Sequence, residues 1–378
     1  MIYFDNAATS FPKAPGVSDA MKELIDTYGG NSGRASHKFS IKLSELLFET
    51  RENLTGLIGG RDSSKLIFQK NGTEAINTAI FGLIENKKNI LISPIEHNAV
   101  MRPLRYLESK NKIKISVFKL NKDLTPDFAD YEQHLKNGAD LVVCSAASNV
   151  TGLIMPYEKL AETANYYGAN FILDAAQLIG SYPIDIKNTK VDIICFPGHK
   201  GLLGPHGTGG LFINSNIKFE PLIFGGTGSK SESEYQPDFF PDKYESGTLN
   251  LCGIAGLNAA LKFIKKTGIE NIQSREEKLR QYFIQKLNGL NSIKIIGNNQ
   301  INKYTSVISV VSSKKNICEL AAVLDEKNIA VRMGLHCAPA AHKTFGSFPK
   351  GTLRFGLGFF NNENEIDYVI NVLAELKL

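Results

Sequence analysis

The chain has 378 residues, of which 43% are hydrophobic and 21% are charged, which is the composition of an ordinary globular protein of about two domains. Its net charge of +5 is spread over scattered pairs such as Lys87-Lys88 and not gathered in a dense stripe, so we expect no nucleic-acid-binding surface. Residues 1–15 lack the pattern of a signal peptide and no apolar run is long enough to span a membrane, so we expect a cytoplasmic protein without membrane segments.

Short apolar runs alternate with amphipathic stretches through the first two thirds of the chain. The spacing of apolar residues predicts helices at 73–85 and 156–168. Strands that are apolar throughout and alternate with helices indicate a mostly parallel sheet that is covered on both faces. The expected strands are 65–68, 89–93, 113–120, 139–148, 168–176, 191–196 and 209–214.

The last third of the chain has a different pattern. A polar stretch at 225–248 predicts a long surface connection, and 250–268 is typical of a long helix. The remainder, from about 260 onward, predicts a smaller α+β unit. Its expected strands are 306–311 and 352–358, and its expected helices are 317–327 and 364–377.

The first polar groups of interest follow the strands at 65–68 and 89–93. Gly72 and Thr73 would open a helix, and their backbone N–H groups would then form an anion site suited to a phosphate. Such a helix start more often has no ligand. His97 lies at the exit of the second strand, where a single histidine is more often structural than functional.

Polar groups also follow the next three strands. Asn149 comes after 139–148 and by itself fits an ordinary turn. Asp174 ends an apolar strand, where a carboxylate is costly unless it is paired, although capping of the next helix is the plainer explanation. Lys200 follows His199 at the end of a buried strand, and burial lowers the pKa of a lysine and so favours a nucleophile or a Schiff base.

Together these groups match the needs of one cofactor, pyridoxal 5′-phosphate (PLP). Its aldehyde requires a lysine, and its pyridine nitrogen requires a carboxylate to stay protonated. Its phosphate requires N–H groups and hydroxyls, and its ring requires a flat side chain. Five consecutive strand ends supply this set, which no single motif does.

The chain resembles the class-V aminotransferases, which are fold-type I PLP-dependent transferases, and among them the cysteine desulfurases. The resemblance implies an α/β fold with a mostly parallel seven-stranded sheet in a large PLP-binding domain, 15–258, and a smaller α+β domain formed by 1–14 and 259–378. It is carried by motifs in the family's order: "YFDNAATSFP", "NGTEAIN", "EHNAV", "SNVTG", "LDAAQ", "GHKGLLGPHGTG", "ESGTLN", "VRMGLHCAP" and "TLRFGLGFFNNENEID".

The resemblance implies a role for each residue around the cofactor ring. Lys200 would bind the cofactor covalently and move protons. Asp174 would pair with the pyridine nitrogen, and Gln177 would donate a hydrogen bond to the ring oxygen. His97 would stack on the ring and take part in proton transfer.

Other residues would hold the phosphate. The resemblance assigns Gly72, Thr73 and His199 to it, and it places Thr248 on the phosphate of a neighbouring subunit, which implies a homodimer. The family usually has a serine or threonine two residues before the histidine, and this chain has Pro197 there, which has no N–H or hydroxyl to donate. We expect compensation elsewhere or weaker cofactor retention.

The substrate side of the site is also implied by the resemblance. Asn149 and Arg354 would bind the substrate α-carboxylate, which a guanidinium grips with two parallel hydrogen bonds. Ala8 would line the substrate pocket. Arg34 and His37 would lie near the entrance of the site, although a solvated loop is an equal alternative. No metal is expected.

Cys337 selects the reaction within the family. It lies in the loop "MGLHCAPAAH", and the nearby Arg332 and His336 would favour its thiolate. The other four cysteines lie in strand or helix patterns, where a buried thiol is ordinary, and the absence of C-x-x-C pairs predicts reduced thiols. The short distance from Cys337 to Arg354 resembles group II, SUF-type desulfurases.

The implied reaction converts L-cysteine to L-alanine and leaves a persulfide on Cys337 for a sulfur-acceptor protein. A selenocysteine lyase acting on L-selenocysteine, or another class-V PLP enzyme, would use the same residues. A nucleotide-binding protein is weakly suggested by "FGGTGSKSES", which lacks the end of a P-loop motif. A catalytically silent scaffold is opposed by the intact lysine, aspartate, arginine and cysteine.

Overall fold

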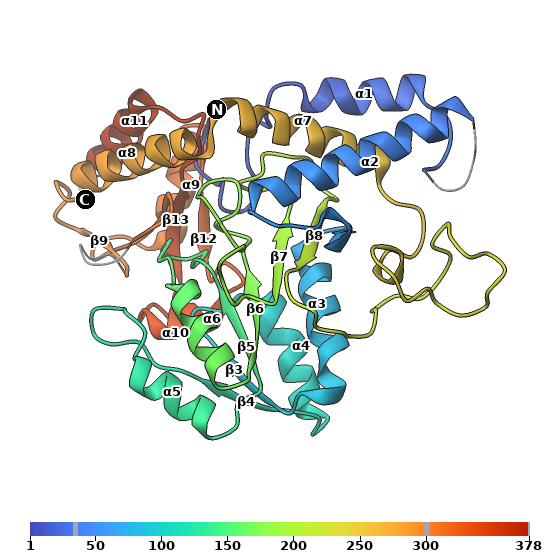
Figure 1. Cartoon of the computed structure of the whole chain (residues 1–378). Coiled ribbons are helices and arrows are strands. Elements are labelled where there is room, and N and C mark those ends of the chain that lie inside the picture. The colour runs from blue at the N-terminus through green and yellow to red at the C-terminus, as the bar shows by residue number, and fades with distance from the viewer. Residues whose placement is uncertain (33–36, 298–302, 377–378) are drawn as a thin grey trace.

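The computed structural model describes residues 1–32, 37–297 and 303–376, and at its centre lies a seven-stranded sheet (Figure 1). The strand order is β2-β8-β7-β6-β5-β3-β4, and β8 runs opposite to the other six strands. The strands are β2 Leu66–Gln69, β3 Asn89–Ile92, β4 Lys114–Val117, β5 Leu141–Ser145, β6 Asn170–Asp174, β7 Ile193–Pro197 and β8 Gly209–Ile213. The predicted α/β fold with a mostly parallel seven-stranded sheet is confirmed.

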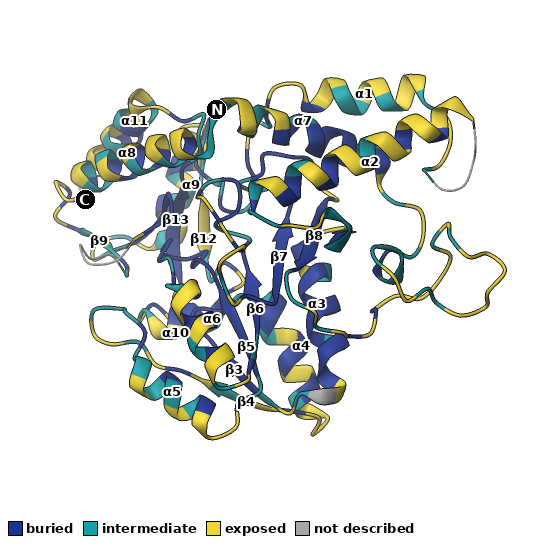
Figure 2. Ribbon diagram, in the orientation of Figure 1, coloured by how far each residue is buried: buried dark blue, intermediate teal, exposed yellow. Residues whose placement is uncertain are grey.

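Both faces of the inner strands of this sheet are buried, as their apolar runs require, whereas the edge strand β4 is exposed at both ends. In β5, Val142 and Cys144 belong to one hydrophobic core, and Leu141 and Val143 belong to the other. Successive side chains of a strand point to opposite faces, so an unbroken apolar run supplies both cores. Figure 2 shows the result as buried strands between helices that are exposed on one side.

Helices cover the sheet from both sides. α3 packs on β7 and β8, α6 packs on β6, and α7 packs on both α1 and α2. The helices that precede the second sheet are α1 Val17–Thr27, α2 Lys38–Leu57, α3 Gly72–Leu83, α4 Asn98–Ser109, α5 Phe128–Lys136, α6 Tyr157–Tyr166, α7 Leu251–Thr267 and α8 Ile269–Leu287. In the part of the chain that is described, no helix is long and apolar enough to cross a bilayer.

A second, smaller sheet is antiparallel and has its own core. Its order is β12-β13-β10-β9, and Phe4 from the N-terminal segment lies in the same core. The elements are β9 Ile293–Ile295, β10 Val307–Ser312, α9 Ile317–Glu326, β11 Ile329–Ala330, β12 Arg332–Gly334, α10 Pro339–Thr344, β13 Thr352–Gly356 and α11 Glu363–Glu375. The short strand β1 Ile2–Tyr3 runs parallel to β11.

Two connections matter for the site. The stretch between β8 and α7 contains only a short 3₁₀ turn, Asp242–Tyr244, and loops away from the body in Figure 1, as its polar composition predicts. The boundary predicted at residue 258 falls inside α7. The division into domains at 15–258 therefore stays a prediction, since α7 continues without a break across the predicted boundary.

Candidate active site

The carboxyl ends of the parallel strands surround one pocket. Such ends are where open α/β sheets bind ligands. The pocket is lined by all of the predicted cofactor residues except Thr248: Gly72, Thr73, His97, Asn149, Asp174, Gln177, His199 and Lys200. The sequence separates these residues by more than a hundred positions, and the strand order brings them together.

Lys200 and Asp174 follow neighbouring parallel strands, in which Asp174 is paired with Cys195 of β7. Burial lowers the pKa of Lys200 to about 8, and the charge of Asp174 opposes that shift. Burial raises the pKa of Asp174, while the Ala176 N–H, 2.9 Å from Oδ1, and the charge of Lys200 hold it down. The charge of each group therefore opposes the effect of burial on the pKa of the other.

His97 caps α4 and is held in one orientation. Its Nδ1 accepts a hydrogen bond from the Ala99 N–H at 3.0 Å, so the neutral ring carries its proton on Nε2. Burial, and next the charge of Lys200, lower the pKa of His97 to about 4. His97 is thus a neutral, flat side chain at neutral pH.

The start of α3 forms the candidate phosphate cradle. Asn71 Oδ1 accepts the Glu74 N–H at 2.8 Å, as the cap spacing predicts. A Cβ at Gly72 would lie 3.2 Å from Cδ of Pro197, so glycine lets the helix start lie this close to the end of β7 without displacing either segment. His199 Nδ1 is buried and has no hydrogen-bond partner among the described residues, which leaves it for a ligand.

The Cys337 loop is fastened to the rim of this pocket by its main chain. The Cys337 carbonyl accepts the Asn98 N–H at 2.8 Å, and the His336 carbonyl accepts Nδ2 of Asn149 at 2.7 Å. Both His336 and Cys337 have positive φ angles, 47° and 55°, which marks a tight turn. The Cys337 side chain remains exposed.

The expectation that His336 is a cation beside the thiol is wrong. Its ring is buried, and Nε2 lies 2.9 Å from Oγ1 of Thr352. Burial, and next the charge of Arg354, lower its pKa to about 2, so it is neutral. Arg332 is the cation that remains close in sequence to Cys337.

Arg354 is a buried guanidinium on β13. Its Nη1 donates to the backbone carbonyl of Asn149 at 3.0 Å, and its Nη2 pairs with Oδ1 of Asp5 at 2.8 Å. Its Nε is buried and lacks a partner among the described residues. The same asparagine thus contacts both Arg354 and the Cys337 loop.

Gln177 lines the pocket and connects it to the N-terminal segment. Its Nε2 donates to the Ala7 carbonyl at 2.9 Å and so ties the segment with Ala8 to the site. His37 caps α2 through Nδ1 and is absent from the pocket lining. Arg34 lies outside the described residues.

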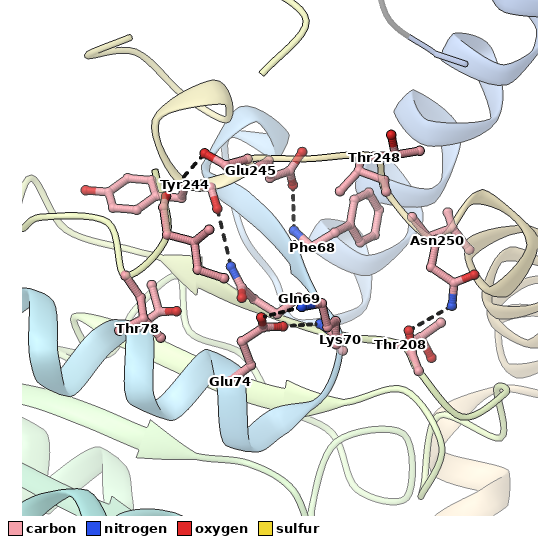
Figure 3. Close-up of a pocket in the computed structure, with 17 residues that line it drawn as sticks. Phe68, Gln69, Lys70, Glu74, Thr78, Thr208, Tyr244, Glu245, Thr248 and Asn250 are labelled. Carbon is pink, nitrogen blue, oxygen red and sulfur yellow. Dashed lines mark hydrogen bonds and ion pairs between the residues drawn. The ribbon is translucent and has the colours of Figure 1, made fainter. Parts of the chain in front are cut away.

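Thr248 lines a second pocket (Figure 3). It is exposed, and the wall beside it is formed by Phe68, Gln69 and Lys70 of the β2 end. The segment is anchored by Glu245, which accepts the Phe68 N–H at 2.6 Å and pairs with Arg51. Within one chain, Thr248 is therefore not a lining residue of the pocket that holds Lys200.

Three contributors were missed by reasoning from sequence: Asp5, Glu96 and Asn98. Glu96 is fully buried and accepts the N–H and hydroxyl of Ser145 at 2.7 and 2.8 Å. Burial raises its pKa to about 8. The one feature of the sequence that could have pointed to Glu96 is its position directly before His97. No such indication exists for Asp5 or Asn98, because their partners are distant in sequence.

Residues 2–369 match the model of the aminotransferase class-V family. The chain belongs to this family. It is 34% identical over 384 residues to a probable cysteine desulfurase of Pyrococcus abyssi, covering 100% of this chain and 94% of that protein. A probable cysteine desulfurase of Methanothermobacter thermautotrophicus is 32% identical, over 99% of this chain and 94% of the relative.

Solved structures show the same likeness. The apo cysteine desulfurase of Thermococcus onnurineus NA1 superimposes with a TM-score of 0.92 at 31% identity, covering 99% of this chain and 94% of that one. The cysteine desulfurase CsdA of Escherichia coli gives a TM-score of 0.89 at 24% identity, with the same coverage, which shows the shared fold.

Membership of the class-V family implies PLP, and the residues of this pocket fit it. A lysine with a lowered pKa and a buried carboxylate share the cavity, which suits the aldehyde and the pyridine nitrogen. The start of α3 and the unpaired His199 Nδ1 suit the phosphate.

Proposed function

We propose that the protein is a PLP-dependent cysteine desulfurase that converts L-cysteine to L-alanine and holds the removed sulfur as a persulfide on Cys337. The observation that carries this proposal is the attachment of the Cys337 loop to the rim of the Lys200 pocket through Asn98 and Asn149. The likeness to desulfurases along the whole chain supports it.

The cofactor residues have separate tasks. When bound, PLP supplies a ring that accepts electrons and makes the substrate Cα–H bond acidic. Lys200, with a pKa of about 8, removes and returns a proton at Cα, and Asp174 keeps the pyridine nitrogen protonated. With PLP bound, His97 would present its neutral ring to the cofactor and would exchange a proton only at Nε2, because Nδ1 accepts the Ala99 N–H.

The substrate residues complete the reaction. Arg354 binds the α-carboxylate of L-cysteine, and Ala8 and Asn149 line the substrate side. The Cys337 thiolate forms an S–S bond with the substrate sulfur as the Cβ–S bond breaks, and the carbon side takes the electron pair and protons to leave as alanine. The sulfur on Cys337 passes to the thiol of an acceptor protein, which is thereby converted to a persulfide.

The short, ordered Cys337 loop supports assignment to group II, because it lies between β12 and α10 with its main chain hydrogen-bonded on both sides. We also propose a homodimer. Thr248 is exposed and lies in a separate pocket of its own chain, which supports its contact with the cofactor phosphate of the neighbouring subunit.

The test uses the PLP-loaded protein with L-cysteine and a thiol reductant, and measures alanine and sulfide in equal amounts. The proposal predicts turnover that Cys337→Ala abolishes while the variant still binds PLP. Cys318→Ala is the matched control, since Cys318 is also an exposed thiol, and it should retain full turnover. A Cys337→Ala variant that releases sulfide as fast as the wild type would contradict the role of Cys337.

A further inference from the structure

Two arginines lie directly opposite one another in the small sheet. Arg332 of β12 and Arg354 of β13 are register partners in an antiparallel pair, so their side chains leave the same face. Like charges at such positions repel and destabilise a sheet. The repulsion is serious here because Arg354 is buried, with 2% of its side chain exposed.

Asp5 bridges the two arginines with its two oxygens. Oδ1 lies 2.8 Å from Nη2 of Arg354, and Oδ2 lies 3.2 Å from Nε of Arg332. Among the residues that the structure describes, no other carboxylate forms an ion pair with either arginine. One acid therefore offsets two cations and leaves a single net positive charge.

The backbone fixes Asp5 in this place. The residues on both sides of it bond to Gly356, since the Gly356 N–H donates to the Phe4 carbonyl and the Asn6 N–H donates to the Gly356 carbonyl at 3.1 Å. Asp5 itself forms a bridge with Gly356, two residues beyond Arg354. The N-terminal segment thus runs beside the end of β13 and presents Asp5 to both arginines.

Some N–H groups of the Arg354 guanidinium have partners in the structure and one nitrogen does not. Nη1 is engaged by the Asn149 carbonyl, and one Nη2 proton is engaged by Asp5. The buried Nε has no partner among the described residues. Nε–H and one of the two Nη2 protons form one edge of the guanidinium, which is the geometry that binds a carboxylate with two parallel hydrogen bonds, and Nε is the donor of this edge that lacks a partner among the described residues.

We propose that Asp5 is a positioning residue for the substrate: it offsets the Arg332–Arg354 repulsion and holds the Arg354 guanidinium so that its Nε edge receives the substrate α-carboxylate. This rests on the proposed function, because it takes Arg354 as the carboxylate anchor. In this role Asp5 acts through Arg354 and needs no contact of its own with the substrate or the cofactor.

The test compares two ligands that differ only in the carboxylate. L-Alanine and ethylamine are titrated into PLP-loaded protein, and binding is followed by the change in cofactor absorbance. Asp5→Asn should weaken L-alanine by about tenfold or more, the scale of a lost hydrogen bond to a charged group, and leave ethylamine within about twofold. Asp367→Asn, which breaks the exposed pair with Lys286, is the matched control and should change neither ligand.

A double variant tests the charge argument. Asp5→Asn combined with Arg332→Gln removes the repulsion together with its compensation, so L-alanine should bind more tightly than to Asp5→Asn alone. If Asp5→Asn does not fold, Asp5→Glu keeps the charge but displaces the guanidinium, and it should weaken L-alanine only.

Three outcomes would overturn the proposal. They are unchanged or tighter L-alanine binding in Asp5→Asn, an equal loss for L-alanine and ethylamine, and a double variant that binds L-alanine no better than Asp5→Asn. Failure of the desulfurase assignment would give a different result. Asp5→Asn would still weaken the binding of L-alanine and not of ethylamine, but the wild type would form no alanine from L-cysteine.

Discussion

The side-chain amide of Asn149 donates to the carbonyl of His336 at 2.7 Å, and this bond joins the pocket wall to the residue that precedes Cys337. The backbone carbonyl of Asn149 also accepts Nη1 of Arg354. Asn149 therefore holds both the loop of Cys337, the candidate sulfur nucleophile, and Arg354, the candidate binder of the substrate carboxylate. Displacing that residue should disturb the distance between thiol and substrate.

Asn149→Ala should slow alanine formation by about ten- to a hundredfold, because a buried hydrogen bond to the loop is lost and the thiol is less well placed. The variant should still bind PLP through Lys200, so its cofactor absorbance should persist. Alkylation of Cys337 should become faster as the loop loosens. An Asn149→Ala variant with wild-type turnover would show that the loop does not depend on this bond.

The lowered pKa of Lys200 predicts how the apoprotein captures PLP. Covalent capture requires the neutral amine, so its rate should rise with pH with a midpoint near pH 8, far below the ordinary lysine value of 10.5. The Asp174 charge raises the Lys200 pKa, so Asp174→Asn should move this midpoint to lower pH. The rate is measured by trapping the lysine–cofactor link with borohydride at a series of pH values, and a midpoint near 10.5 would contradict the burial argument.

Gly72→Ala should weaken cofactor binding by about tenfold, because the added Cβ lies 3.2 Å from Pro197 Cδ and 3.3 Å from its N, and the start of α3 must shift. Gly56 is the matched control. It lies within α2, and a Cβ there meets nothing within 4 Å, so Gly56→Ala should leave PLP affinity unchanged and raise the free energy of unfolding by about 0.5–1 kcal/mol. Equal PLP affinities in the two variants would argue against the cradle.

Glu96 should make stability depend on pH. Burial raises its pKa from 4.5 to about 8, so between these values the folded state binds a proton that the unfolded state has lost. Its contribution to stability therefore falls as pH rises from about 4.5 to about 8 and is constant above that. Glu96→Gln imitates the protonated acid, whose partners are Ser93 and Ser145, and removes the dependence.

Chemical denaturation of both proteins at several pH values checks this. The stability of Glu96→Gln relative to the wild type should increase across that window and then level off. Glu96→Ala, which loses the hydrogen bonds at every pH, should be less stable than Glu96→Gln throughout. A constant difference between wild type and Glu96→Gln would mean that Glu96 is ionised in the folded protein.

Much of the site follows from local patterns in the sequence. Asp174 and Lys200 end strands whose apolar runs are unambiguous, and parallel strands place their carboxyl ends at one edge, so their meeting is predictable. The contacts of Asp5 cannot be predicted in this way, because Arg332 and Arg354 lie more than three hundred residues from it in sequence and are brought together by the pairing of β12 with β13. His336 failed as a predicted cation because sequence proximity to Cys337 does not reveal that its ring is buried against Thr352.

The most direct test of the central claim is to locate the sulfur. The PLP-loaded protein is given one equivalent of L-cysteine per site without added reductant and digested, and the masses of its peptides are measured. One extra sulfur atom is expected on the peptide that contains Cys337, in an amount equal to the alanine formed, and none on the peptides that contain Cys252 or Cys318. Alanine formed with no sulfur on the Cys337 peptide, or sulfur on another cysteine, would contradict a persulfide on Cys337.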